Sequence, residues 1–278
     1  MTEHVRVAVA LDGCGSHPGA WRAPGARANA LTAAAHWQQL VGEAEAGLLD
    51  FVTLADTFAL HRGHSRTDRA TGGLDSVLLA SRLAPTTRLI GLIPTATATH
   101  TEPFHVSKAI ATLDYVSQGR AGVLLRTTAD PDEAALFGRR RFPDDPAVLA
   151  DLASEALDFA TVLGLLWDSW EDDAEIRDVE TGRFIDRDRL HYIDFDGEFF
   201  SFDDADMRLK PLHTPTIVCA GQSPAGQAFT AEHGDRNFIM AERSKVGDIA
   251  AGVRRLSRGR PPQARGPGSR ARGPRPRP

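Results

Sequence analysis

The sequence has very little cysteine and no long apolar run. Only two cysteines, Cys14 and Cys219, occur among 278 residues. A disulfide-stabilised fold is therefore excluded, and a reducing, cytoplasmic environment is expected. No apolar stretch approaches the ~20 residues that cross a bilayer. The amino terminus also lacks the basic region and apolar core of a signal peptide, so we expect neither a secreted protein nor a membrane partner.

Charge is unevenly distributed along the chain. Acidic residues outnumber basic ones by 37 to 32, yet residues 258–278 hold seven arginines and no acid. This segment is rich in Pro and Gly, and we predict that it forms a disordered tail. It is interpreted either as a tether to nucleic acid or an anionic surface, or as an extension without function, such as out-of-frame translation. No aromatic residues interleave with the arginines, which favours the second interpretation, and the acidic body argues against a nucleic-acid partner.

Apolar, β-rich segments alternate with helix-like segments six times. Strands are predicted at residues 5–11, 49–55, 88–94, 121–125, 216–220 and 237–240, and helices at 33–46, 74–83, 103–116, 147–167, 224–233 and 245–256. This alternation is typical of parallel strands joined by crossover helices. Both a doubly wound open sheet and a (β/α) barrel fit the pattern. The absence of G-x-G-x-x-G after the first strand counts against a dinucleotide-binding sheet.

One long insertion interrupts the alternation. Residues 168–213, after the fourth predicted helix, are acidic and contain a segment, residues 195–202, that predicts a small β-hairpin. Insertions of this length are usually functional lids or partner surfaces. The expected organisation is one α/β domain over residues 1–257 that contains this insertion, followed by the tail.

Polar residues gather where the predicted strands end, which is where parallel α/β folds bind ligands. Asp56 follows the second strand, where it either binds a ligand or caps a helix. Thr97 belongs to an alternating threonine run after the third strand, which presents hydroxyls to a ligand or is simply a β-branched strand end. Ser223 precedes Pro224 at a helix start. That position favours an anion such as phosphate, or serves only as a cap.

The histidines do not follow a recognisable metal or triad pattern. His17, His100 and His105 lack the spacing of zinc ligands, so no metal site is expected. No G-x-S-x-G elbow supports a Ser-His-Asp triad either.

Seven ordered motifs carry a specific resemblance. They read GAWR (19–22), LADTFAL (54–60), GLIPTATATHTEPFHV (91–106), LDYVSQGRAG (113–122), LWDSWEDDA (166–174), FDGEFF (195–200) and AGQSPAG (220–226). From about residue 5 to about residue 257 the chain resembles the bacterial luciferase-like flavin-dependent monooxygenases, in the nitrilotriacetate, alkanesulfonate and dibenzothiophene-sulfone branch. The resemblance implies a TIM-like (β/α) barrel that is incomplete, with about six of its eight strands.

The same resemblance implies a two-component monooxygenase. Reduced FMN, supplied by a separate NAD(P)H-dependent flavin reductase, would bind at the carboxyl-terminal mouth and oxidise a small organic substrate with O2. By position in the motifs, Asp56, Thr97 and Ser223 match flavin-contacting residues, and His17 matches a substrate-side histidine. Family members are commonly dimers or tetramers, so a homo-oligomer is expected.

Three positions depart from the family pattern. Leu124, Leu149 and Ala153 stand where the family has Asn, His and Tyr, so three polar partners of the flavin are missing. Each loss from a dry polar site costs about 1–3 kcal/mol. Two alternatives therefore stay open. One is a non-catalytic, truncated remnant or subunit with weakened flavin binding. The other, from the residues alone, is an unrelated barrel enzyme for a phosphate-bearing ligand.

Overall fold

The computed structural model describes residues 6–15, 17, 19–59, 68, 70, 72–143, 145, 147–207, 209–219, 231 and 236–237. A six-stranded sheet forms the centre of this part, in the spatial order β1-β2-β3-β4-β9-β10, and every neighbouring pair is parallel. Its strands are β1 (Ala8–Leu11), β2 (Phe51–Leu54), β3 (Gly91–Thr97), β4 (Gly122–Arg126), β9 (Thr216–Cys219) and β10 (Arg236–Asn237). The parallel α/β architecture predicted from the alternating pattern is thereby confirmed.

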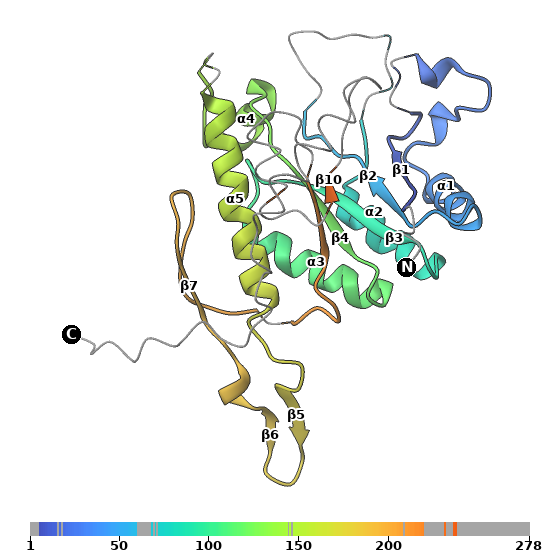
Figure 1. The fold of residues 1–278 in the computed structure, drawn as a ribbon. Coiled ribbons are helices and arrows are strands. Elements are labelled where there is room, and N and C mark those ends of the chain that lie inside the picture. The colour runs from blue at the N-terminus through green and yellow to red at the C-terminus, as the bar shows by residue number, and fades with distance from the viewer. Residues whose placement is uncertain are drawn as a thin grey trace.

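Helices connect the strands and cover one face of the sheet (Figure 1). The covering helices are α1 (Ala34–Ala46), α2 (Ser76–Leu83), α3 (Pro103–Ser117) and α5 (Val148–Trp167), whereas α4 (Pro131–Phe137) follows the carboxyl end of β4 and adds no residue to the core cluster. The core lies between the two layers. Its centre includes Val52, Leu92 and Val123 from three adjacent strands, with Ile110 of α3 and Phe159 of α5, each 0% exposed.

Local sequence explains where the helices begin. Asp75 caps α2 by accepting the N–H of Leu78. Asp130 caps α4 by accepting the N–H groups of Asp132 and Glu133, and Pro131 occupies the first turn, where a missing N–H costs nothing. The sequence pattern does not predict α4. The insertion predicted after the fourth helix consequently follows α5, the fifth helix of the structure.

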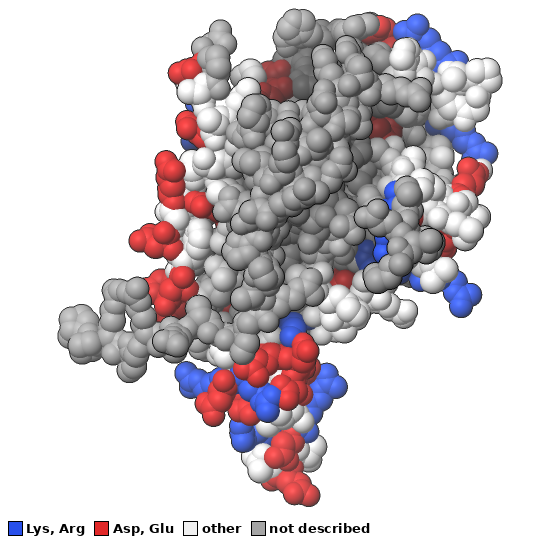
Figure 2. Space-filling view, viewed as in Figure 1, with Lys and Arg blue, Asp and Glu red and all other residues white. Residues whose placement is uncertain are grey.

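The insertion consists largely of two antiparallel hairpins. The first pairs β5 (Glu175–Asp178) with β6 (Arg183–Ile185), and the second pairs β7 (Ile193–Asp196) with β8 (Ser201–Ala205). The second is the hairpin that residues 195–202 predicted. Figure 1 shows that the β5–β6 hairpin projects beyond the carboxyl-terminal end of α5. Figure 2 shows charges of both signs mixed over this projection and acidic side chains along the edge where α5 runs.

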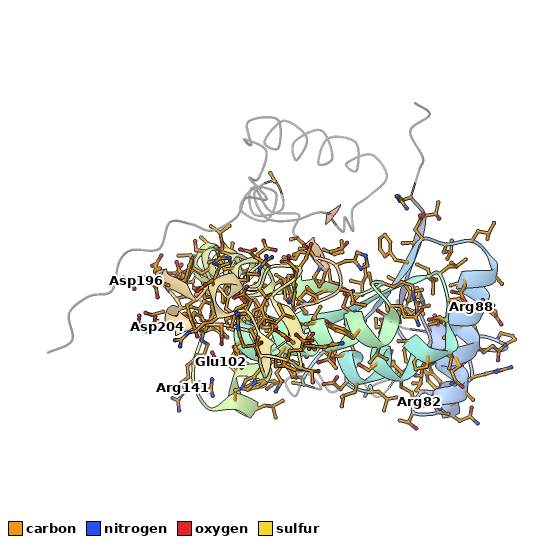
Figure 3. All side chains as sticks on the ribbon, turned by 90° about the horizontal axis from the view of Figure 1, so that it is seen from below. Arg82, Arg88, Glu102, Arg141, Asp196 and Asp204 are labelled. Carbon is orange, nitrogen blue, oxygen red and sulfur yellow. The ribbon has the colours of Figure 1, made fainter. Side chains whose placement is uncertain are left out.

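The strands of the sheet begin at one common edge, the amino edge, and end at the opposite one, the carboxyl edge. At the amino edge, the Glu45 carboxylate accepts the backbone N–H groups of Arg88, Leu89 and Ile90 just before β3. Figure 3 places Arg82 and Arg88 at the opposite end of the molecule from Glu102 and Arg141. Within the described ranges, no helix combines the length and apolar composition that a bilayer crossing needs.

Candidate functional site

The candidate site lies at the carboxyl edge of the parallel sheet. Because β1 to β4 are parallel and in register, their carboxyl ends meet at this edge. Thr97 is the last residue of β3 and pairs with Arg126, the last residue of β4. Asp56 follows β2 by two residues. The structure therefore places two of the predicted site residues at the ends of adjacent strands.

Asp56 is tied to the neighbouring elements through Ser76. Its Oδ2 accepts the backbone N–H of Ser76 at 2.9 Å. The Ser76 hydroxyl in turn donates to the carbonyl of Thr95 in β3 at 2.9 Å and accepts the Thr95 N–H at 3.1 Å. Burial raises the pKa of Asp56 above its ordinary value, against the opposing effect of the Ser76 N–H. The carboxylate is therefore held in a fixed position in a partly desolvated environment.

The threonine run uses its three hydroxyls differently. Thr95 Oγ1 donates to the carbonyl of Leu54 at 2.7 Å, which joins β3 to β2. Thr99 Oγ1 accepts the backbone N–H of Thr128 at 3.0 Å. Thr97 Oγ1 accepts a hydrogen bond from Arg126 Nη1 at 3.2 Å. Thr95 and Thr99 thus join backbone segments, whereas Thr97 is engaged by a side chain at the carboxyl edge.

An aromatic cluster follows the same strand ends. His100 stacks on Phe137 with ring centroids 4.8 Å apart, and Phe58 meets Phe137 edge-on at 4.9 Å. His100 is 8% exposed, and its Nε2 has no hydrogen-bond partner among the residues that the structure describes. Burial lowers the pKa of His100, which favours the neutral ring. His100 and Phe137 thus form a parallel stack with Phe58 edge-on to it, and His100 Nε2 is left without a partner.

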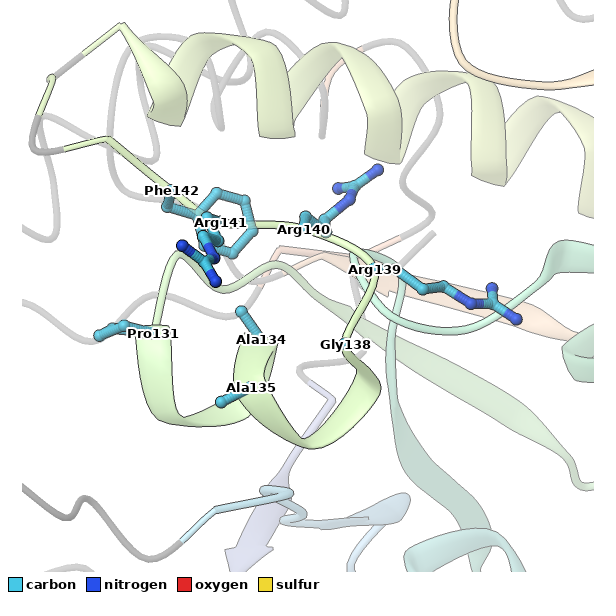
Figure 4. A pocket seen from close by; sticks show the side chains of 8 residues that line it. All are labelled: Pro131, Ala134, Ala135, Gly138, Arg139, Arg140, Arg141 and Phe142. Atoms are coloured by element: carbon cyan, nitrogen blue, oxygen red, sulfur yellow. The ribbon is translucent and has the colours of Figure 1, made fainter.

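A pocket of about 640 Å³ lies beside this stack, between α4 and the segment that follows it. Figure 4 shows Arg141 and Phe142 over the pocket, whereas Arg140 points toward α5. Arg140 forms a two-pronged ion pair with Glu155 of α5, at 2.6 and 2.7 Å. This volume lies within the range of small-molecule sites.

The other two predicted site residues are less constrained by the structure. His17 is exposed, and its Nδ1 accepts the N–H of Gly19 at 3.1 Å. No hydrogen bond connects it to Asp56 or Thr97 in the described part of the chain. Ser223 lies outside the described residues, as do the predicted helix at 224–233 except for residue 231, the predicted helix at 245–256 and the predicted tail.

The sequence pattern does not predict the ion pair beside Thr97. Arg126 ends β4, and its guanidinium meets Glu133 of α4, which is completely buried. The available signal was Asp130-Pro131 after a strand, which marks a helix start and places residue 133 in the first turn. At the positions that depart from the family pattern, Leu124 and Ala153 are half-buried and Leu149 is 62% exposed.

Comparison with known proteins decides the family. The sequence profile of the luciferase-like monooxygenases matches residues 14–271. The chain belongs to the luciferase-like monooxygenase family. The resemblance carried by the seven motifs is confirmed, and the fold is that of the luciferase-like TIM barrels.

Several relatives are curated monooxygenases. The chain is 34% identical over 231 residues to N-acetyl-S-(2-succino)cysteine monooxygenase of Bacillus subtilis, covering 83% of this chain and 51% of the relative. It is 35% identical over 239 residues to nitrilotriacetate monooxygenase component A of Aminobacter aminovorans, covering 82% and 52%. It therefore spans about half the length of the curated relatives it matches.

Solved structures agree on the fold. A riboflavin lyase crystallised with modified FMN and the substrate riboflavin matches with a TM-score of 0.82 at 26% identity, over 92% of this chain and 59% of that one. A long-chain alkane monooxygenase matches with a TM-score of 0.83 at 24% identity, over 93% and 62%. The second match is evidence for the fold alone.

Proposed function

We propose that this chain binds FMN at the carboxyl edge of its sheet and acts in a two-component monooxygenase that oxidises a small organic substrate with O2. A separate NAD(P)H-dependent reductase supplies the reduced flavin, and the protein works as a homo-oligomer. The observation that carries the proposal is the placement of Asp56 and Thr97 at adjacent strand ends in a member of this family. The relative named as component A of a monooxygenase supports the two-component arrangement.

The residues present fit a flavin. An isoalloxazine ring is flat, carries an N–H donor and several acceptors, and needs protection from water. The carboxylate of Asp56 accepts hydrogen bonds, and the hydroxyl of Thr97 retains a proton to donate. His100 and Phe137 supply a parallel ring stack beside the strand ends. We place the phosphate at Ser223, where the start of a helix would stabilise the negative charge.

Each of these residues has a distinct role in the proposal. Reduced FMN, when bound, supplies the electrons with which O2 is activated. Asp56 orients the ring through its N–H, Thr97 donates to a ring acceptor, and the aromatic stack excludes water from the reacting face. His17, on the segment after β1, contacts the substrate.

Anaerobic titration of the purified chain with reduced FMN tests the proposal. We expect a micromolar dissociation constant. Asp56→Asn should weaken binding roughly 10- to 100-fold, since a hydrogen bond to a charged group contributes about 1.5–3 kcal/mol. Asp196→Asn is the matched control, because Asp196 is exposed on the β7–β8 hairpin (Figure 3). Its affinity should equal that of the parent chain.

The outcomes separate the alternatives. A folded chain that binds no reduced FMN contradicts the proposal and favours the non-catalytic subunit, for which the apolar side chain of Leu124 at the site is the supporting observation. Binding of sugar phosphates in place of FMN favours a phosphate-ligand enzyme. Incorporation of one atom of labelled O2 into the substrate, with a flavin reductase present, tests the oxygenase step itself.

A further inference from the structure

The Arg126 guanidinium is fixed by a buried carboxylate. Glu133 is 0% exposed, and its two oxygens accept hydrogen bonds from Arg126 Nη1 at 3.0 Å and Nη2 at 2.8 Å. Arg126 ends β4, and Glu133 lies in the first turn of α4, which Asp130 caps. Two-pronged pairing of this kind fixes the plane of the guanidinium as well as its distance. The pair therefore holds a rigid set of N–H donors at the carboxyl edge.

The fixed guanidinium determines what the Thr97 hydroxyl can do. Arg126 Nη1 lies 3.2 Å from Thr97 Oγ1. A guanidinium has donors and no acceptor, so the hydroxyl oxygen must accept in this contact. The hydroxyl proton is consequently directed elsewhere. Thr97 is only 3% exposed, and no hydrogen bond donated by its hydroxyl is found within the described part of the chain.

Strand register places this donor on the inner face of the sheet. Thr97 pairs with Arg126, and the preceding pair is Ala96 with Leu125. Ala96 and Leu125 belong to the core that packs against the helices. Side chains alternate along a strand, so Thr97 and Arg126 lie on the opposite face. Inward-facing side chains at the carboxyl ends of the strands border the mouth where such barrels bind their ligands.

We propose that Arg126, held by Glu133, is a positioning residue that presets Thr97 as a hydrogen-bond donor to an acceptor atom of the flavin ring. This inference rests on the proposed function, because it assigns the ligand of the Thr97 proton. Arg126 acts through Thr97 and does not itself contact the flavin. Its removal therefore matters only while the Thr97 hydroxyl is present.

A double-mutant cycle on FMN affinity tests this dependence. The four proteins are the parent chain, Thr97→Val, Arg126→Met/Glu133→Leu, and the combination of all three substitutions. Both members of the pair are replaced together because removal of one leaves an unpaired buried charge. Arg183→Met/Asp186→Leu is the control, since that ion pair lies on the insertion and away from the strand ends. Thr97→Ser, which keeps the hydroxyl, is the conservative variant.

We expect Thr97→Val and Arg126→Met/Glu133→Leu each to weaken FMN binding by about 3- to 10-fold. In the Thr97→Val background, the pair substitution should change the dissociation constant less than about twofold, as should the control pair and Thr97→Ser in the parent chain. The absorption band of bound FMN should shift in the same two variants. Circular dichroism and thermal unfolding confirm that each variant is folded.

Other outcomes overturn the inference in separable ways. If the pair substitution weakens FMN equally with and without the Thr97 hydroxyl, Arg126 contacts the ligand or merely supports α4, and the inference fails while the proposed function stands. If neither substitution changes the affinity, the Thr97 proton serves no flavin acceptor. If the parent chain binds no FMN, the proposed function fails and this inference fails with it.

Discussion

Arg120 closes the amino edge of the sheet, and its removal should lower stability without altering ligand affinity. Its guanidinium donates five hydrogen bonds from the turn before β4. The acceptors are the carbonyls of Ser117, Ala84, Ile90 and Thr87 and the Thr87 hydroxyl, at 2.7 to 3.2 Å. All four of these residues are buried. One side chain thus satisfies polar groups from the end of α3, the segment that follows α2 and the approach to β3.

The size of the effect follows from those acceptors. A buried polar group left without a partner costs about 1–3 kcal/mol. If only two of the carbonyls lose their partner in Arg120→Met, the free energy of unfolding falls by roughly 2–6 kcal/mol. Domains are stable by about 5–15 kcal/mol in total, so this is a large fraction. At about 2–4 °C for each kcal/mol, the unfolding midpoint should fall on the order of 10 °C.

Thermal unfolding followed by circular dichroism measures this change, with Arg88→Met as the control. Arg88 is an exposed arginine at the same edge (Figure 3). Its replacement should move the midpoint by about 1 °C, within the range of ordinary surface substitutions. The reasoning is refuted if Arg120→Met lowers the midpoint no more than Arg88→Met. Below the midpoint, the FMN affinity of Arg120→Met should equal that of the parent chain.

Three further expectations follow from single residues. Phe159→Ala should lower the free energy of unfolding by about 3–5 kcal/mol, because Phe159 is 0% exposed. Phe184 is 58% exposed, so Phe184→Ala should change the free energy of unfolding little. Equal losses for the two variants in urea unfolding would contradict this. Although burial raises the pKa of Glu45, its three backbone N–H bonds outweigh burial and lower that pKa overall. The stabilising contribution of Glu45 is therefore lost as the pH falls through the lowered value. In urea unfolding at decreasing pH, Glu45→Gln should lose less free energy of unfolding than the parent chain. Burial raises the pKa of Asp56, so the free energy of unfolding should fall as the pH rises from the ordinary Asp pKa of about 3.9 through the raised value. Asp56→Asn should remove this dependence on pH. Urea midpoints that change in parallel with pH in both proteins would count against it.

The sequence predicted the sheet well because buried parallel strands are apolar on both faces. The third strand shows the limit of that argument. It was predicted at 88–94 and lies at Gly91–Thr97. Leu89 and Ile90 are as apolar as a strand, yet the N–H groups of residues 88–90 bind the Glu45 carboxylate, 43 to 45 residues away. An apolar sequence pattern cannot show whether a backbone N–H pairs with a neighbouring strand or with a side chain, because the side-chain acceptor, Glu45, comes from another element.

Of the predicted site residues, Asp56 and Thr97 could be positioned from the sequence, but their hydrogen-bond partners could not. Asp56 and Thr97 lie at adjacent strand ends, as the carboxyl-end argument required. The role of each threonine was not predictable, because period-two spacing gives the face of a hydroxyl and not its partner. Thr95 is used by the Leu54 carbonyl, and Thr97 is engaged by Arg126. Both partners lie on neighbouring strands, so assigning them requires the register between the strands, which the sequence pattern does not give.

Stability and binding are carried by different edges of the same sheet, and this makes the two separable by experiment. At the amino edge, Arg120 and Glu45 satisfy backbone groups of neighbouring elements, so a substitution there acts on folding. At the carboxyl edge, the Thr97 hydroxyl proton and His100 Nε2 have no hydrogen-bond partner among the described residues, so a ligand could form hydrogen bonds with both. A buried polar group without a partner lowers stability, and a ligand that satisfies it recovers that free energy on binding. FMN should therefore raise the unfolding midpoint of the parent chain and of Arg120→Met by similar amounts, and raise that of Thr97→Val by less.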